Sequence, residues 1–134
     1  MTYEEIRAAI TARAAAFTGI EQTRIDYQNA LAVAVFVPPE TGLWCRMTIQ
    51  HGTAFFAGMG DRPHSRKPGQ IVFQCFARPR TGMKPITALV DALEEHFGYW
   101  SAGDLECMET SQAVVGDDGN GFYQINVNIR FRAG

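Results

Sequence analysis

The chain has 134 residues, which is close to the commonest size of a single domain and too short for two well-stabilised ones. It is 46% hydrophobic and 19% charged, which excludes a disordered tail and a fibrous protein. The net charge of −2 gives no overall attraction to nucleic acid or to an anionic membrane, and no apolar run reaches the roughly 20 residues that cross a bilayer. The first residues, MTYEEIRAAI, lack the basic start of a signal peptide, so we expect a chain that stays in the cytoplasm.

The first predicted element is a helix over residues 2–18. Thr2 and Glu5 form a capping box at its start, and Gly19 stands where a C-terminal cap belongs. Its apolar residues recur three and four positions apart, so they form one buried stripe of Ile6, Ala9, Ile10, Ala14 and Phe17.

Strands are predicted in the next part of the chain. Residues 20–29 have no clear period and predict a loop, whereas residues 32–37 predict a short strand that two prolines end. Residues 43–50 alternate between apolar and polar side chains, which indicates a half-buried strand. Residues 70–77 are apolar on both faces, which favours a central strand.

The segment between these two strands, residues 51–69, holds four glycines and two prolines and predicts a long connection or a functional loop. Phe55 and Phe56 are its only large apolar anchors, being the two bulkiest apolar side chains in it. Because its other residues bury little apolar surface, we expect the loop to be poorly paired in an isolated chain and to contact a partner.

A second helix is predicted over residues 83–97, with Pro85 in its first turn and Gly98 after its end. Residues 105–113 and 122–132 predict two antiparallel strands joined by the turn formers GDDGNG. The elements together predict one α+β domain, with two helices packed on one face of a mostly antiparallel four- to five-stranded sheet. Its expected core includes Ile6, Ile10, Phe17, Leu89, Leu93, Tyr123, Ile125, Val127 and Ile129.

The sequence carries no recognisable catalytic motif. The three histidines stand beside no serine or cysteine in a nucleophile motif, and Glu94 and Glu95 are neighbours on an exposed helix face and so do not converge as an acid–base pair. The three cysteines fit neither a disulfide framework nor a metal knuckle, so we expect them to be buried small hydrophobes. We therefore predict that the protein is no enzyme and uses no cofactor or metal.

The charges are segregated along the chain. Six of the twelve basic residues are Arg62, Arg66, Lys67, Arg78, Arg80 and Lys84. No lysine or arginine follows from residue 85 to residue 129, where eight of the fourteen acids are Asp91, Glu94, Glu95, Asp104, Glu106, Glu109, Asp117 and Asp118. Three interpretations stay open: solvated surfaces, a phosphate-binding basic stretch, or a basic surface that meets the acidic surface of the next subunit in a ring.

The last predicted strand has a polar outward side. Gln124, Asn126, Asn128 and Arg130 form a nearly uncharged ladder, which is either an ordinary wet sheet face or a surface for a neighbouring subunit.

Several segments in order resemble the tail terminator proteins of long-tailed bacteriophages. They are EEIRAAITAR, TRIDYQNALAVAVFVPP, ETGLWCRMTI, RKPGQIVFQCFARPRTG, ITALVDALEEHF and GFYQINVNIRFRAG. The strongest parts are the Tyr-x-Asn element with its apolar run and prolines, and the Gly-x-x-x-Phe-Gln strand entry at Gly69, Phe73 and Gln74.

The resemblance implies a phage or prophage virion protein without catalysis or cofactor. Such a subunit assembles in the host cytoplasm as a hexameric ring on the tail tube protein, stops tube polymerisation and gives the surface that joins the head and its completion protein. The alternatives are a head completion or connector protein and a small nucleic-acid-binding module. The expected subunit or tube contacts are Arg62, Arg66, Lys67, Arg78, Arg80, Asp91, Glu94, Glu95, Phe55 and Phe56.

Overall fold

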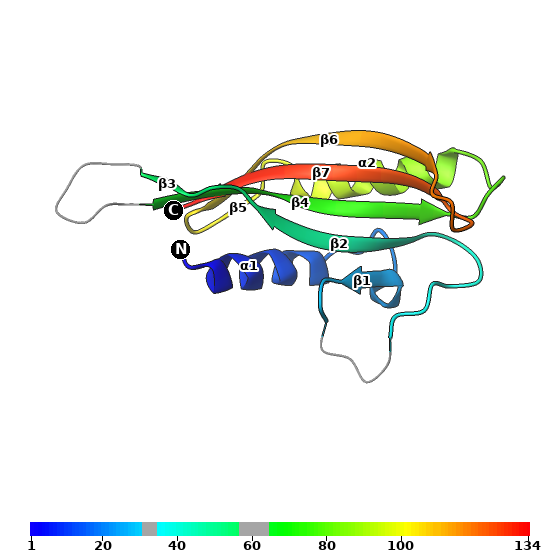
Figure 1. Cartoon of the computed structure of the whole chain (residues 1–134), viewed down its shortest axis with the longest axis horizontal. Helices are drawn as coiled ribbons and strands as arrows, with labels where there is room; N and C mark the ends of the chain where they lie inside the picture. The colour runs from blue at the N-terminus through cyan, green and yellow to red at the C-terminus, as the bar shows by residue number, and fades with distance from the viewer. Residues whose placement is uncertain (31–34, 57–64) are drawn as a thin grey trace.

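A computed structural model describes residues 1–30, 35–56 and 65–134. The chain forms two helices and a mixed sheet that curls into a half-barrel (Figure 1). In chain order the elements are α1 (Tyr3–Ala15), the short 3-10 helix η1 (Gln22–Arg24), β1 (Ile25–Tyr27), β2 (Trp44–His51), β3 (Phe55–Phe56), β4 (Ser65–Ala77), α2 (Lys84–Phe97), β5 (Ser101–Ala102), β6 (Leu105–Asp117) and β7 (Tyr123–Ala133).

Six of the described strands lie side by side in the order β1-β2-β4-β7-β6-β5, and β3 pairs with the start of β4 outside this order. Each neighbouring pair in the series β2-β4-β7-β6-β5 is antiparallel, whereas β1 runs parallel to β2. β4 and β7 pair from Lys67↔Ala133 to Ala77↔Tyr123 and form the centre of the sheet. The long strands β2, β4, β7 and β6 run along the longest axis of the molecule (Figure 1), and β1 and β5 are short additions at the two edges of the sheet.

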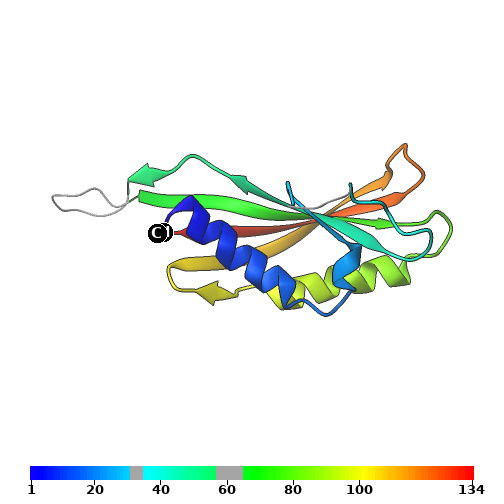
Figure 2. The ribbon, with the colours of Figure 1, turned by 90° about the horizontal axis from the view of Figure 1, so that it is seen from below.

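Both helices cover the same face of the sheet, as Figure 2 shows. One continuous core joins the apolar stripes of α1 and α2 to the inward residues of the strands. The predicted packing on one face is confirmed, and of the predicted core residues only Tyr123 is partly exposed. The buried ones are Ile6, Ile10, Phe17, Leu89, Leu93, Ile125, Val127 and Ile129.

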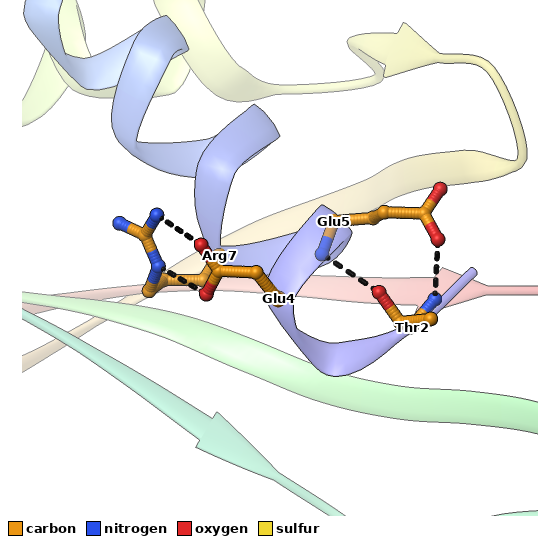
Figure 3. A network of polar contacts seen from close by, with 4 residues as sticks. All are labelled: Thr2, Glu4, Glu5 and Arg7. Carbon is orange, nitrogen blue, oxygen red and sulfur yellow. Dashed lines mark hydrogen bonds and ion pairs between the residues drawn. The ribbon is translucent and has the colours of Figure 1, made fainter.

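The capping box at the start of α1 is present. The hydroxyl of Thr2 accepts a hydrogen bond from the backbone of Glu5 at 3.1 Å, and the Glu5 carboxylate accepts one from the backbone of Thr2 at 3.2 Å (Figure 3). These bonds satisfy two donors that a helix N-terminus leaves free. The predicted cap at Gly19 is wrong, because α1 ends at Ala15 and Ala16 is its C-cap.

The predicted sheet is wrong in two respects: it has six strands rather than four or five, and it is mixed rather than mostly antiparallel. Part of the difference is β1, which lies in the segment predicted as a loop. The other unpredicted strand of the six is β5. Residues 51–69, which were expected to be poorly paired, also contain β3 and the first residues of β4, which begins at Ser65 instead of residue 70. Pro68 and Gly69 weaken the strand signal there, but pairing with β7 holds them in the ladder.

The short strand predicted at residues 32–37 is also wrong in its described part, since residues 35–37 lie outside any strand; residues 32–34 fall outside the described residues. Of the loop predicted at residues 51–69, residues 57–64 likewise lie outside the described part.

The three cysteines are free and buried, as predicted. Cys45 and Cys75 face each other across β2 and β4 in the core. Burial raises the pKa of the Cys45 thiol to about 12 and that of Cys107 to about 11, and it raises the pKa of Cys75 as well. These thiols therefore behave as small apolar side chains at neutral pH.

Replacing Leu93 tests the packing of α2 on the sheet. Leu93 is fully buried, so Leu93→Ala is expected to lower the free energy of unfolding by about 2–5 kcal/mol, measured by urea denaturation. Thr87→Ala changes an exposed position of the same helix and is the control, with an expected change within about 0.5 kcal/mol. Equal stabilities of the two variants would contradict the packing.

The thiols also predict a loss of stability in alkali. Cys45 ionises near its ordinary pKa of 9.0 when the chain is unfolded but only near 12 when it is folded. Above about pH 9 the unfolded chain therefore releases a proton that the folded chain keeps, and the free energy of unfolding falls by about 1.4 kcal/mol per pH unit for this thiol. Urea denaturation at a series of pH values measures the slope. Cys45→Ala is expected to flatten it by that amount, and an unchanged slope would show that Cys45 is not the titrating group.

Candidate functional site

The described residues of the predicted basic stretch are spread over both ends of β4. Lys67 lies near the start of β4 and Arg78 follows its end, so about 35 Å of extended strand separates them. Arg66 pairs with Phe55 of β3 at the same end as Lys67, and Phe56 pairs with Ser65. Arg62 lies outside the described residues.

Two of the basic residues hold other parts of the chain in place. The Lys67 ammonium donates to the backbone oxygen of Met1 at 2.9 Å and lies 5.4 Å from the centre of the Tyr3 ring. Arg78 donates to the backbone oxygen of Pro39 at 2.6 Å, and its guanidinium lies 4.6 Å from the centre of the Phe122 ring. These contacts give both residues a structural role.

Arg78 belongs to an aromatic cluster on the face of the sheet opposite the helices, which we call the open face. Trp44 stacks on Phe76 with their ring centres 4.1 Å apart, and Phe122 meets both rings edge-on. Phe36 lies 5.4 Å from Trp44 and brings the segment before β2 onto the cluster. The open face therefore has a small apolar cluster of its own at this end.

The rest of the open face is polar, as the alternation of β7 predicts. Gln124 donates to Asn126 at 2.7 Å, and Gln70 of β4 donates to Gln50 of β2 at 2.7 Å. Further charges on this face are paired across strands, in the ion pairs Arg46–Asp26, Arg130–Glu109 and Arg132–Glu106. Gln124 is nevertheless 8% exposed, because it lies beside Phe76 in the ladder.

Four of the eight acids in the predicted acidic stretch line one groove, whereas Asp104, Glu106, Asp117 and Asp118 do not line it. Asp91, Glu94 and Glu95 are exposed on α2, and they line a groove of about 540 Å³ with Gly98, Tyr99, Glu109 and Thr110. Glu109 comes from β6, so the groove runs between α2 and that strand. Hydrogen bonds from its own backbone and from Arg130 lower the pKa of Glu109. Because the Glu109 carboxylate is paired with Arg130 on the open face, the negative charge of the groove comes mainly from the three acids of α2. We call this the acidic groove.

The strand beside the acidic groove has an unpaired outer edge. β5 pairs with Leu105 and Glu106, and Trp100 and Tyr99 bond to the backbone of Cys107 and Met108. From Glu109 to Asp117, no backbone hydrogen bond joins this edge to the other described residues. Val114 is 57% exposed and Val115 is 49% exposed on the same stretch. An edge of this kind is able to pair with another chain.

A second groove lies at the opposite edge of the sheet. It has a volume of about 710 Å³ and lies between α1 and the edge formed by β1 and β2. Its described lining contains one cation and no acid: Arg7, Thr11, Tyr27, Gln28, Asn29, Ala30, Met47 and Ile49. We call it the α1 groove.

The histidines described here have structural contacts. His51 meets the Tyr3 and Phe131 rings edge-on, and His96 exchanges hydrogen bonds with Arg13, whose guanidinium donates to the His96 backbone oxygen at 2.6 Å. His64 lies outside the described residues. Within residues 1–30, 35–56 and 65–134, no three His, Cys, Asp or Glu side chains gather closely enough to hold a metal ion.

Sequence reasoning missed the two features that define the edges. The α1 groove depends on β1. This strand has only three residues and no periodic pattern, so it could not be predicted from the sequence. The free edge of β6 depends on the strand order, although the lack of lysine, arginine and proline from residue 105 to residue 117 was a visible signal of an unprotected edge.

Comparison with known proteins supports the fold alone. No protein-family model and no curated protein matches the sequence. A solved structure matches with a TM-score of 0.71 at 15% sequence identity, over 100% of this chain and 96% of that chain. In the described residues, neither helix is long and apolar enough to cross a membrane. The whole chain therefore shares its architecture with a protein of known structure.

Proposed function

We propose that this chain is a structural tail protein of a phage or prophage. In this role it forms a hexameric ring that caps the tail tube, ends polymerisation of the tube protein and gives the surface that joins the head and its completion protein. It assembles in the host cytoplasm, becomes part of the virion tail, and uses neither catalysis nor a cofactor.

The observation that carries the proposal is the difference between the two edges of the sheet. One edge carries the acidic groove and the exposed valines of β6, and the other carries the α1 groove, whose described lining has no acid. A subunit that presents two different surfaces on opposite sides associates head to tail, and head-to-tail contacts close into rings when the rotation fits.

The sequence resemblance supports the same role. The segments EEIRAAITAR and ITALVDALEEHF fall on α1 and α2, and GFYQINVNIRFRAG covers the central strand β7. The resemblance thus follows the elements that build the core and both grooves, rather than one isolated motif.

The charge geometry disfavours a nucleic-acid-binding module. Of the described basic residues in this stretch, Arg66 and Lys67 lie at the start of β4 and Arg78 follows its end, and Lys67 and Arg78 are engaged with the protein backbone. A module that tracks a phosphate backbone needs several cations along one surface. A head completion or connector protein remains the alternative, and the phenotype of a null mutant separates it from a tail terminator.

Deleting the gene from the phage or prophage that carries it tests the proposal. Electron microscopy of the lysate is expected to show overlong tails, or tails of unregulated length that fail to join heads. Tails of normal length beside separate filled heads would assign the protein to head completion instead. Normal virions would overturn both roles.

Complementation with charge-reversed variants tests the acidic groove within that role. Exposed ion pairs contribute only about 0–1 kcal/mol each, so the three helix acids are changed together. Asp91→Lys, Glu94→Lys and Glu95→Lys combined are expected to give the null phenotype. The matched control reverses Glu21, Glu40 and Asp104, which are exposed outside both grooves, and it is expected to restore normal tails. Equal complementation by both variants would show that the acidic groove has no part in assembly.

A further inference from the structure

We infer that the outer edge of β6 in one copy of this chain docks into the α1 groove of a second copy. The partner is thus another molecule of the same protein, and the contact joins opposite edges of two sheets. The inference rests on the proposed ring, and it names the two surfaces that would make each contact in that ring.

Among the described residues, the backbone of β6 has a regular stretch whose outer edge is free to pair. Register with β7 shifts between Cys107 and Thr110 and again between Val114 and Gly116, which leaves Thr110–Val114 as a regular stretch between two irregularities. Its outer edge bonds to no other described backbone. Edge strands are commonly protected by lysine, proline or a covering element, and this stretch has no lysine or proline. It is therefore suited to lie against another chain.

Both the β6 edge and the α1 groove expose apolar side chains. Val114 pairs with the core residue Ile125, so its side chain lies on the face that carries the helices, but it is 57% exposed. Val115 beside it is 49% exposed. The α1 groove offers partly exposed apolar surface in Tyr27 and Ile49. Docking would remove the apolar side chains of both surfaces from water, which stabilises a contact by about 25 cal/mol for each Å² of apolar surface buried.

The charges at the two edges distinguish a contact between β6 and the α1 groove from a contact between two β6 edges. Pairing of β6 with β6 of a second copy would bring two acidic grooves together, and like charges across an interface are unfavourable. The α1 groove has no acid in its described lining and has Arg7 at its rim, although Glu4 shares this guanidinium at 2.6 Å. The charges therefore favour the head-to-tail contact over the symmetric one.

The positions of the two surfaces in the sheet allow the contact to repeat in one direction. β6 and β1 lie on opposite sides of the sheet, with β7, β4 and β2 between them. A copy whose β6 edge is occupied still has its own α1 groove free for the next copy. The same contact is thus able to repeat around a closed ring. A symmetric contact between two β6 edges uses the same edge of both copies and ends at a dimer.

Engineered disulfides test this contact directly. Thr11 lines the α1 groove and Val115 lies on the β6 edge, whereas the three native cysteines are buried and unavailable for cross-linking. The chain with both Thr11→Cys and Val115→Cys, oxidised at high protein concentration, is expected to give a ladder of covalent oligomers on a non-reducing gel. A mixture of the two single variants should give one mixed dimer, identified by mass spectrometry of the linked peptides.

Three results would overturn the inference. They are a homodimer formed by Val115→Cys alone, which indicates the symmetric β6 contact, a homodimer formed by Thr11→Cys alone, and the absence of any mixed dimer. A cysteine placed at Val37, which is 79% exposed outside both edges, serves as the control and should form no ladder when combined with Thr11→Cys.

A second measurement does not depend on disulfide geometry. Val114→Lys combined with Val115→Lys is expected to weaken self-association by roughly tenfold or more in light scattering, which corresponds to about 1.4 kcal/mol. Val37→Lys is the matched control and should leave association unchanged. Circular dichroism checks that each variant is folded, and unchanged association of the folded double variant would overturn the inference.

The outcomes also separate this contact from the proposed function. If the gene deletion gives defective tails but no ladder forms, the docking contact is wrong while the tail role stands. If the ladder forms but the deletion leaves virions normal, the contact stands and the tail role is wrong.

Discussion

The pairing of β4 with β7 is the contact on which the rest of the structure depends. Both strands carry apolar side chains on the helix face along almost their whole paired length, and Phe73, Val127 and Ile129 are among the most deeply buried residues. This surface is too large to leave in water, so both helices must cover it. Because they cover the same face, no described helix covers the open face, which is polar outside its aromatic cluster, and the strands at both sides remain sheet edges.

The elements that could be predicted from sequence are those whose pattern is local. α2 repeats its apolar residues every three or four positions, and β7 alternates along its whole length, so each element specifies its own buried face. The start of β4 could not be found in this way. Pro68 and Gly69 argue against a strand, and pairing with β7, which is remote in sequence, and with the end of β2 keeps them extended.

Charge segregation along a sequence predicts a surface only when the fold brings the segment together. The acids of α2 and Glu109 of β6 are up to 18 positions apart, yet the turn through Gly98 and Tyr99 folds them into one groove. The basic residues are spread along a strand, and an extended strand carries its two ends far apart. The same pattern in sequence therefore corresponds to one groove on α2, whereas the described basic residues are spread over both ends of β4.

The two edges differ because different lengths of chain protect them. β1 adds three residues beside β2, and the side chain of Gln28 accepts a hydrogen bond from the backbone of Ile49, so that edge is partly satisfied. β5, Tyr99 and Trp100 bond to β6 only from Leu105 to Met108, and the rest of this long strand, to Asp117, has no such partner among the described residues. The two register shifts twist β6 and limit indiscriminate pairing, but they do not bury its valines. A sheet built in this way keeps one edge nearly closed and the other available, and that asymmetry gives a head-to-tail assembly its direction.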